Sequence, residues 1–299
     1  MDFGKVPESS LMDVNFILPG EPAWNASILN GKPITAPKVY LGCAKWGRKE
    51  WVGKIYPKGT KEANFLDEYV KHYNSIELNA THYKLYDVTA IQKWANKTQD
   101  DFLFCPKVYQ GISHFGNLKD KQPLTDTFLH SITAFGKHLG PIFLQLSDKF
   151  GPKRKEDLFN YLELLPHDVT FFLEVRHSDW FEQTLFEDLL LTLKRLKIGI
   201  VITDTAGRRD CCHMHLSNTK TFIRYVGNSL HETDYTRIDN WVDRLQYWLN
   251  TGLSELYFFM HMHDEALSPE LTVYLVDKLN EACNLNLKKP GFLPAGLSG

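Results

Sequence analysis

Short apolar runs recur at regular intervals along most of the chain. Eight of them stand out, and they begin at Val39, Ser75, Phe102, Ile142, Phe171, Ile198, Phe222 and Leu256. Successive runs start about 31 residues apart on average, which is the length of one strand plus one helix that leads back to the next strand. Because most positions within a run are apolar, the runs are typical of strands buried on both faces of a parallel sheet.

The segments between the runs carry apolar residues at helical spacing. One stripe places Phe128, Ile132 and Phe135 four and three residues apart. Similar stripes lie within residues 65–73, 185–196, 238–249 and 271–279. Eight alternating strands and helices predict an α/β fold, a single-domain (β/α)8 TIM barrel. An open, doubly wound sheet is the alternative, but the sequence contains neither GxGxxG nor GxxxxGK[ST], the motifs that often mark phosphate sites in such sheets.

The two ends of the chain differ from this regular middle. Residues 1–37 contain five prolines and three glycines, which predict an irregular extension that packs on the main domain or hangs from it. The barrel is expected over residues 38–286, followed by a short tail over residues 287–299. No apolar run reaches the ~18 residues of a membrane span, and the N-terminus lacks the pattern of a secretory signal. We therefore expect no membrane contact.

Charge and cysteine content narrow the classes of partner. The chain has 34 Lys and Arg against 36 Asp and Glu, a formal net charge of −2. A protein that coats nucleic acid or binds a membrane surface carries a broad surplus of positive charge, so nucleic acid is not an expected partner, although a local anion pocket is compatible with this balance. The five cysteines are odd in number and contain no CxxC pair, which indicates reduced thiols and a cytoplasmic location.

Polar residues cluster late in the predicted strands. A barrel interior is packed, so charged side chains belong near the C-terminal rim, at alternate positions of each strand. Strand ends carry such residues throughout: Glu77 and Asn79, Lys107, Gln145, Glu174 and Arg176, Thr203 and Asp204, Arg224, and His261 and His263. The alternative is that some of these charges form buried pairs that only fix the geometry of the barrel.

These residue types constrain the chemistry of the rim. Lys107, Arg176 and Arg224 would place three positive charges around one cavity, which matches a phosphate or carboxylate. The carboxylates Glu77, Glu174 and Asp204 are candidates for an acid, a base or a metal ligand. The aromatic residues that follow strands, Trp46, Tyr83 and Trp180, are candidates for stacking on a ring of the ligand, or fill gaps in the core.

Metal-binding signals in the sequence are weak. No HExxH motif occurs, and the two HxH pairs are not diagnostic. His213 and His215 precede the seventh strand and are expected on the opposite side of the barrel, in a structural or surface role. His261 and His263 lie at the rim and share one face of the eighth strand, so they are the better candidates. No metal ligand is assigned, and the cofactor is unknown.

Several motifs together resemble a known family. The segments GCAKWGRKEWVGKIYP, IELNATHYKL, FCPKVYQGISH, LGPIFLQLSDKF, LEVRHSDW and FIRYVG occur in this order over residues 38–286 and resemble the DUF72 family, also called YecE-like, whose members are uncharacterised. The resemblance implies a TIM barrel and implies that the rim residues occupy motif positions of the family. The ends of two strands depart from its pattern: Val226 stands where the family typically has histidine, and His261 and His263 lie where it is rich in amides.

The resulting hypothesis is an enzyme that acts on an anionic small molecule, phosphorylated or carboxylated, by general acid–base chemistry at the C-terminal rim, with a hydrolase as one version. A non-catalytic ligand-binding or scaffold protein and a metal-assisted phosphodiesterase of nucleic acid are the alternatives. The candidate catalytic residues are Glu77 and Glu174, and the candidate substrate-binding residues are Trp46, Asn79, Tyr83, Lys107, His114, Gln145, Arg176, His177, Trp180 and Arg224. The hypothesis depends on Glu77, Lys107, Glu174, Arg176 and Arg224 converging in one mouth.

Overall fold

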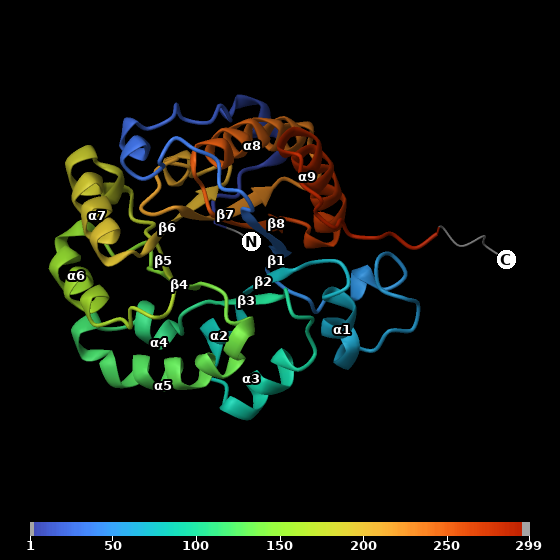
Figure 1. The fold of residues 1–299 in the computed structure, drawn as a ribbon, viewed down its shortest axis with the longest axis horizontal. Coiled ribbons are helices and arrows are strands. Elements are labelled where there is room, and N and C mark those ends of the chain that lie inside the picture. The colour runs from blue at the N-terminus through green and yellow to red at the C-terminus, as the bar shows by residue number, and fades with distance from the viewer. Residues whose placement is uncertain (1–2, 295–299) are drawn as a thin grey trace.

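The fold is built from parallel strands that alternate with helices (Figure 1). The structure is a computed structural model, and it describes residues 3–294. The strands within these residues are β1 (Lys38–Cys43), β2 (Ser75–Leu78), β3 (Leu103–Pro106), β4 (Ile142–Gln145), β5 (Phe171–Glu174), β6 (Gly199–Asp204), β7 (Lys220–Gly227) and β8 (Glu255–Met262). The α-helices are α1 (Phe65–Tyr69), α2 (Ala80–Tyr83), α3 (Val88–Ala95), α4 (Gln110–Ser113), α5 (Gln122–Ile132), α6 (Lys155–Glu163), α7 (Gln183–Leu196), α8 (Glu232–Thr251) and α9 (Ser268–Cys283).

The strands form a curled sheet with helices on its outside (Figure 1). One ladder joins six strands in the order β1-β8-β7-β6-β5-β4, a second joins β2 to β3, and every pairing is parallel. The predicted α/β class and parallel order are therefore confirmed. The ladder does not run without a break around all eight strands, so the sheet is open between β1 and β2 and between β3 and β4.

Other contacts cross both breaks. Between β3 and β4, Lys107 and Phe143 form an isolated parallel bridge, and the Val108 amide donates to the Phe143 carbonyl over 3.0 Å. Between β1 and β2, the side chain of Asn74 replaces a ladder: its Oδ1 accepts from the Leu41 amide at 2.7 Å and its Nδ2 donates to the Val39 carbonyl at 2.9 Å. An amide side chain offers one donor and one acceptor and so mimics a backbone peptide at this break.

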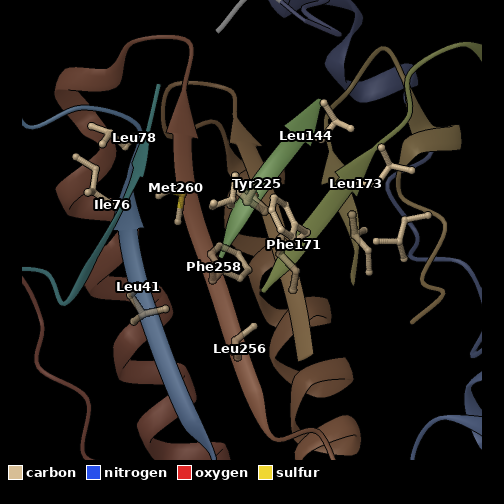
Figure 2. Close-up of a cluster of buried hydrophobic side chains, with 14 of the residues drawn as sticks. Leu41, Ile76, Leu78, Leu144, Phe171, Leu173, Tyr225, Leu256, Phe258 and Met260 are labelled. Carbon is tan, nitrogen blue, oxygen red and sulfur yellow. The ribbon is translucent and has the colours of Figure 1, made fainter. Parts of the chain in front are cut away.

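Alternation along the strands divides the core into two layers. The interior of the curl is filled by large side chains from successive strands, namely Cys105, Phe143, Phe172, Val201, Phe222, Tyr257 and Phe259. The opposite faces of the strands, including Leu41, Ile76, Leu173 and Phe258, belong to the larger cluster that packs under the helices (Figure 2). Because the interior is packed, only side chains at the strand ends are free to build a site.

The N-terminal extension packs on the domain. It contains two short 3-10 helices, Glu8–Asp13 and Ala23–Ser27. Asn25 is 1% exposed and bonds the backbone of Met214 and Leu216, while Glu21 forms an ion pair with Arg244. Parts of the predicted extension and tail, residues 1–2 and 295–299, lie outside the described residues. Across residues 3–294, no helix is both long enough and apolar enough to cross a bilayer.

Candidate functional site

Arg224 is the centre of a buried charge cluster at the C-terminal ends of the strands. It is 1% exposed, and its Nε and Nη2 donate to the two carboxylate oxygens of Glu77, each over 2.8 Å. Its Nη1 donates to Glu174 Oε2 at 2.8 Å and Oε1 at 3.1 Å. One guanidinium from β7 therefore links carboxylates from β2 and β5, which are 97 positions apart in the sequence.

Glu77 has every acceptor position filled. Besides the two bonds from Arg224, Oε1 accepts from Asn79 Nδ2 at 2.8 Å, and His261 Nε2 lies 2.9 Å from Oε2. A carboxylate offers about four lone-pair sites, so no acceptor remains for a substrate proton. Burial raises the pKa of Glu77, but the charge of Arg224 and the hydrogen bonds from Arg224 and His261 outweigh burial and hold it well below its usual range. This carboxylate is permanently ionised at neutral pH.

Glu174 is less completely engaged. Its Oε1 accepts from Arg176 Nε at 2.8 Å and from the Thr203 hydroxyl at 3.2 Å, whereas among residues 3–294 Oε2 accepts only from Arg224. Burial again raises its pKa, and Arg176 and Arg224 more than reverse this effect, so the pKa is lowered. Of the two candidate catalytic carboxylates, Glu174 therefore keeps an acceptor position.

Lys107 lies in the same cluster without a carboxylate partner. Its Nζ donates to Gln145 Oε1 at 2.7 Å, and within residues 3–294 no carboxylate oxygen lies within 4.0 Å of it. Burial and then the positive charge of Arg224 lower the pKa of the Lys107 ammonium to about 7, against the opposing attraction of Glu174. Near neutral pH this amine exchanges its proton readily, which is the property of a general acid or base.

Arg176 is the outermost guanidinium of the cluster. Only its Nε is used, in the bond to Glu174, and its terminal nitrogens donate no hydrogen bond within the described part of the chain. Its guanidinium carbon lies 3.8 Å from the ring centroid of Phe3, so the N-terminal segment covers it. The segment is held by the Thr205 hydroxyl on the Phe3 carbonyl at 3.1 Å and by the Gly207 amide on the Gly4 carbonyl at 2.8 Å.

The positive charges at this rim help to lower the pKa values of two histidines. The rings of His82 and His114 are 4.8 Å apart. Burial, then the charge of Lys107, lowers the pKa of His82 to about 3, and burial, Lys107 and Arg176 lower the pKa of His114. Neither His82 nor Phe3 was among the residues that the sequence predicts for the site. The position of His82 beside Tyr83 was the one available signal, and nothing in the sequence pointed to a contact between Phe3 and Arg176.

The chain belongs to the DUF72 family. The profile described as "Protein of unknown function DUF72" matches residues 40–294. The UPF0759 protein YecE of Escherichia coli K12 is 29% identical over 280 residues, which cover 86% of this chain and 97% of that protein. The UPF0759 protein YunF of Bacillus subtilis 168 is 27% identical over 165 residues, or 52% of this chain and 57% of that protein. The described activity of this family is unknown, so these matches assign no reaction.

Solved DUF72 structures share the fold. A DUF72 family protein from Enterococcus faecalis V583 superposes with a TM-score of 0.64 at 16% identity, covering 85% of this chain and 100% of that chain. A second, from Thermotoga maritima MSB8, gives a TM-score of 0.63 at 18% identity, covering 83% of this chain and 100% of that chain. At this level of identity the likeness concerns the backbone architecture alone.

Two residues that depart from the DUF72 pattern, Val226 and His261, are neighbours in the structure. Val226 and His261 are register partners on β7 and β8, so both side chains lie on one face of the sheet. Val226 is fully buried, and the imidazole of His261 bonds Glu77. An imidazole from β8 therefore lies beside the β7 position at which the resemblance predicts a histidine.

The three aromatic candidates lie in different surroundings, two at a cavity and one in the core. Trp46, Tyr83 and Asn79 line an apolar cavity of about 340 Å³ at the ends of β1 and β2, and Tyr83 is 68% exposed. Asn79 joins this cavity to the charge cluster through its bond to Glu77. Trp180 is fully buried, and its indole nitrogen donates to the Phe150 carbonyl at 2.8 Å, which favours the alternative that it fills a gap in the core.

Two further predictions need correction or restriction. Asp204 does not face the rim cluster: it points outward to α8, where it pairs with Arg237 at 2.9 Å and accepts from Trp241 Nε1 at 2.7 Å. Its β6 neighbour Thr203 faces Glu174 instead, as alternation requires. His177 lies in the loop after β5, where its Nδ1 accepts a hydrogen bond from the Asp179 amide. It is not one of the residues that the hydrogen bonds of the charge cluster join.

Within residues 3–294 no group of three or more His, Cys, Asp or Glu side chains is arranged to hold a metal ion. His261, one of the better candidates, is engaged with Glu77. His213 packs on Phe186, and its Nε2 lies 3.2 Å from the Val201 carbonyl, which agrees with the structural role expected for it.

Proposed function

We propose that the rim of this DUF72 protein binds a small molecule through its phosphate or carboxylate group and acts on it by proton transfer. Arg176 binds the anionic group with its two terminal nitrogens, and Lys107 transfers the proton. The observation that supports this most directly is a guanidinium with unused donors next to a buried amine that lacks a counterion. Arginine donors in a planar fork match the oxygens of phosphate and carboxylate.

The charge balance of the cluster supports an anionic ligand. Glu77 and Glu174 are matched by Arg224 and Arg176, so protonated Lys107 adds an unbalanced positive charge. The lowered pKa values of His82 and His114 have Lys107 among their causes. A ligand with negative charge relieves this repulsion, and it must displace the ring of Phe3 from Arg176, a contact worth ~0.5–2 kcal/mol.

The remaining candidates take supporting roles. Glu77 is saturated, so we assign it to positioning Arg224, whereas Glu174 keeps an acceptor position on Oε2 for a proton. Gln145 orients Lys107, and Asn79 orients Glu77. His114 lies beside His82 next to the charged groups, and the cavity lined by Trp46 and Tyr83 is available for an apolar part of the ligand.

The supporting scaffold is a closed (β/α)8 barrel in this proposal. Two contacts support closure across the breaks: the Asn74 side chain bonds the backbone of β1, and Lys107 forms a backbone bridge with Phe143 between β3 and β4. All five cysteines are free thiols, which supports a location in a reducing compartment such as the cytoplasm.

A non-catalytic ligand-binding protein is the second candidate function. The hydrogen bonds to Glu77 fill its acceptor positions, so Glu77 takes no part in proton transfer.

Replacing Arg176 with Gln should weaken sulfate binding by about tenfold to a hundredfold, because a hydrogen bond to a charged group contributes ~1.5–3 kcal/mol. The measurement is the sulfate Kd by isothermal titration calorimetry. Lys149→Ala is the matched control, since Lys149 is an exposed lysine in the loop after β4. An equal loss in both variants, or no sulfate binding by the wild type, would contradict the proposed site.

Sulfate affinity should fall as the pH rises through about 7, the pKa of Lys107. The sign follows from the charge: below this pH the ammonium attracts the anion, and above it the neutral amine does not. Sulfate keeps its charge over pH 5.5–8.5, so titration of the probe does not contribute to the change. Titrations across this range should give a step for the wild type and a flat profile for Lys107→Met. A flat wild-type profile would remove Lys107 from the site.

A further inference from the structure

We propose that Lys107 is a nucleophile that forms an imine with a small aldehyde or ketone carrying a phosphate or carboxylate group. This inference rests on the proposed function, because Arg176 binds the anionic end of that molecule. It goes further in naming the substrate class, a carbonyl compound, and a covalent role for a residue that otherwise only binds or exchanges a proton.

The count of charges around Lys107 supports a neutral amine. Both carboxylates of the cluster are bound by guanidinium groups, Glu77 by Arg224 and Glu174 by Arg224 and Arg176. Lys107 is left with the neutral amide oxygen of Gln145. A third buried cation beside two guanidiniums is unfavourable, and a lysine that is desolvated next to other cations is the arrangement that makes its amine nucleophilic.

Burial without a counterion sets Lys107 apart from the other lysines of the described chain. It is 7% exposed and is the only lysine there that is buried. Two partly buried lysines of the scaffold do have carboxylate partners: Lys54 pairs with Glu270 and Lys97 with Asp67, each at 2.6 Å. The pKa of about 7 for Lys107 agrees with its lack of a counterion. At pH 8 most of its amine is therefore free to react, whereas exposed lysines are almost fully protonated.

The position of the amine suits attack on a molecule held at the rim. Lys107 follows β3 and projects to the same face as Cys105, which lines the interior of the curl. Gln145 Oε1 accepts a hydrogen from Nζ and so orients the amine without occupying its lone pair. The Phe143 ring, with its centroid 6.0 Å from Nζ, forms an apolar wall on one side.

The reaction balances without a further reagent. The lone pair of Nζ attacks the carbonyl carbon, and the π electrons of the C=O bond move to oxygen, which takes up a proton. The resulting carbinolamine loses water, whose oxygen comes from the carbonyl and whose two hydrogens come from the amine. The C=N bond that forms is more electron-withdrawing when protonated than the C=O bond it replaces. It thereby favours proton removal or bond cleavage at the adjacent carbon.

The probe is glyoxylate, a small aldehyde with a carboxylate, incubated with the full-length protein and cyanoborohydride at pH 8. Reduction converts an imine into a stable carboxymethyl-lysine, which peptide mass spectrometry locates. We expect Lys107 to be modified at least tenfold faster than the exposed Lys149, and sulfate to slow only the reaction of Lys107. Acetaldehyde, which lacks the carboxylate, should keep only the part of this preference that comes from the neutral amine of Lys107, and sulfate should slow its reaction less.

Variants separate this inference from the proposed function. Lys107→Arg should keep sulfate binding and lose the fast modification, whereas Arg176→Gln should weaken sulfate binding and slow the modification of Lys107. Sulfate binding with equal modification of Lys107 and Lys149 would overturn the imine and leave the anion site intact. If the wild type neither binds sulfate nor shows selective modification of Lys107, both the imine and the proposed anion site are wrong. Selective modification that sulfate fails to slow would contradict the inference as stated, because Arg176 would not be holding the carbonyl compound.

Discussion

Replacing Arg224 with Met should lower the free energy of unfolding by about 3–5 kcal/mol, the range found when one partner of a buried ion pair is removed. Arg224 is 1% exposed and bonds two carboxylates that are 0% and 2% exposed. Without the guanidinium, Glu77 and Glu174 would face each other as buried anions with much less compensation. The loss corresponds to a fall in Tm of roughly 10 °C for a domain of this size.

The measurement is urea denaturation followed by circular dichroism, together with the thermal midpoint. The double variant Arg224→Met/Glu77→Gln should recover part of the stability, since one of the two uncompensated charges is removed with it. Lower pH should also narrow the gap to wild type, because the carboxylates of the variant take up protons while those of the wild type stay ionised longer. A midpoint equal to that of the wild type would instead show that Arg224 is held for a ligand rather than for stability.

Replacing Gly42 with Ala should destabilise the protein by at least about 3 kcal/mol, the upper end for overpacking in a core. A Cβ at Gly42 would lie 2.1 Å from the Ser75 carbonyl oxygen and 2.7 Å from its carbon. Both are backbone atoms of β2, so the clash is relieved only by separating β1 from β2. The Tyr69 hydroxyl crosses the same gap, donating to Ser75 and accepting from the Cys43 amide.

Gly47→Ala is the matched control, because a Cβ there meets nothing within 4 Å. Denaturant midpoints of the two variants test whether the backbones of β1 and β2 are in contact, as a closed barrel requires. Equal stability of the two variants would mean that this edge of the sheet is open and would remove the proposed closure.

The strand pattern could be predicted closely. The apolar runs starting at Phe102, Ile198 and Leu256 correspond to strands that begin at Leu103, Gly199 and Glu255. Strands buried on both faces leave a continuous apolar signal, and regular spacing separates them from helices. What the pattern could not reveal is how the ladder breaks, because the break between β1 and β2 depends on Asn74 and Tyr69, whose roles are set by neighbours in space.

Convergence of the rim charges was also predictable in part. Alternation along β2 and β5 predicted that Glu77 and Asn79, and Glu174 and Arg176, share a face, and the structure joins each pair by a hydrogen bond. The same rule could not predict which of two adjacent polar residues of β6, Thr203 or Asp204, faces inward. Asp204 is instead satisfied by Arg237, which the sequence places 33 positions away.

The order of apolar and polar residues thus specifies the strands, the helices and the end of the sheet where charge collects, because burial of apolar surface acts on every residue according to its local period. Which charges compensate each other follows from distances between strands that are remote in the chain. Folding brings Arg224 between two carboxylates, leaves Lys107 without one, buries Trp180 and lays Phe3 over Arg176. Ion pairing depends on separations of a few ångströms, and a linear sequence does not contain those separations.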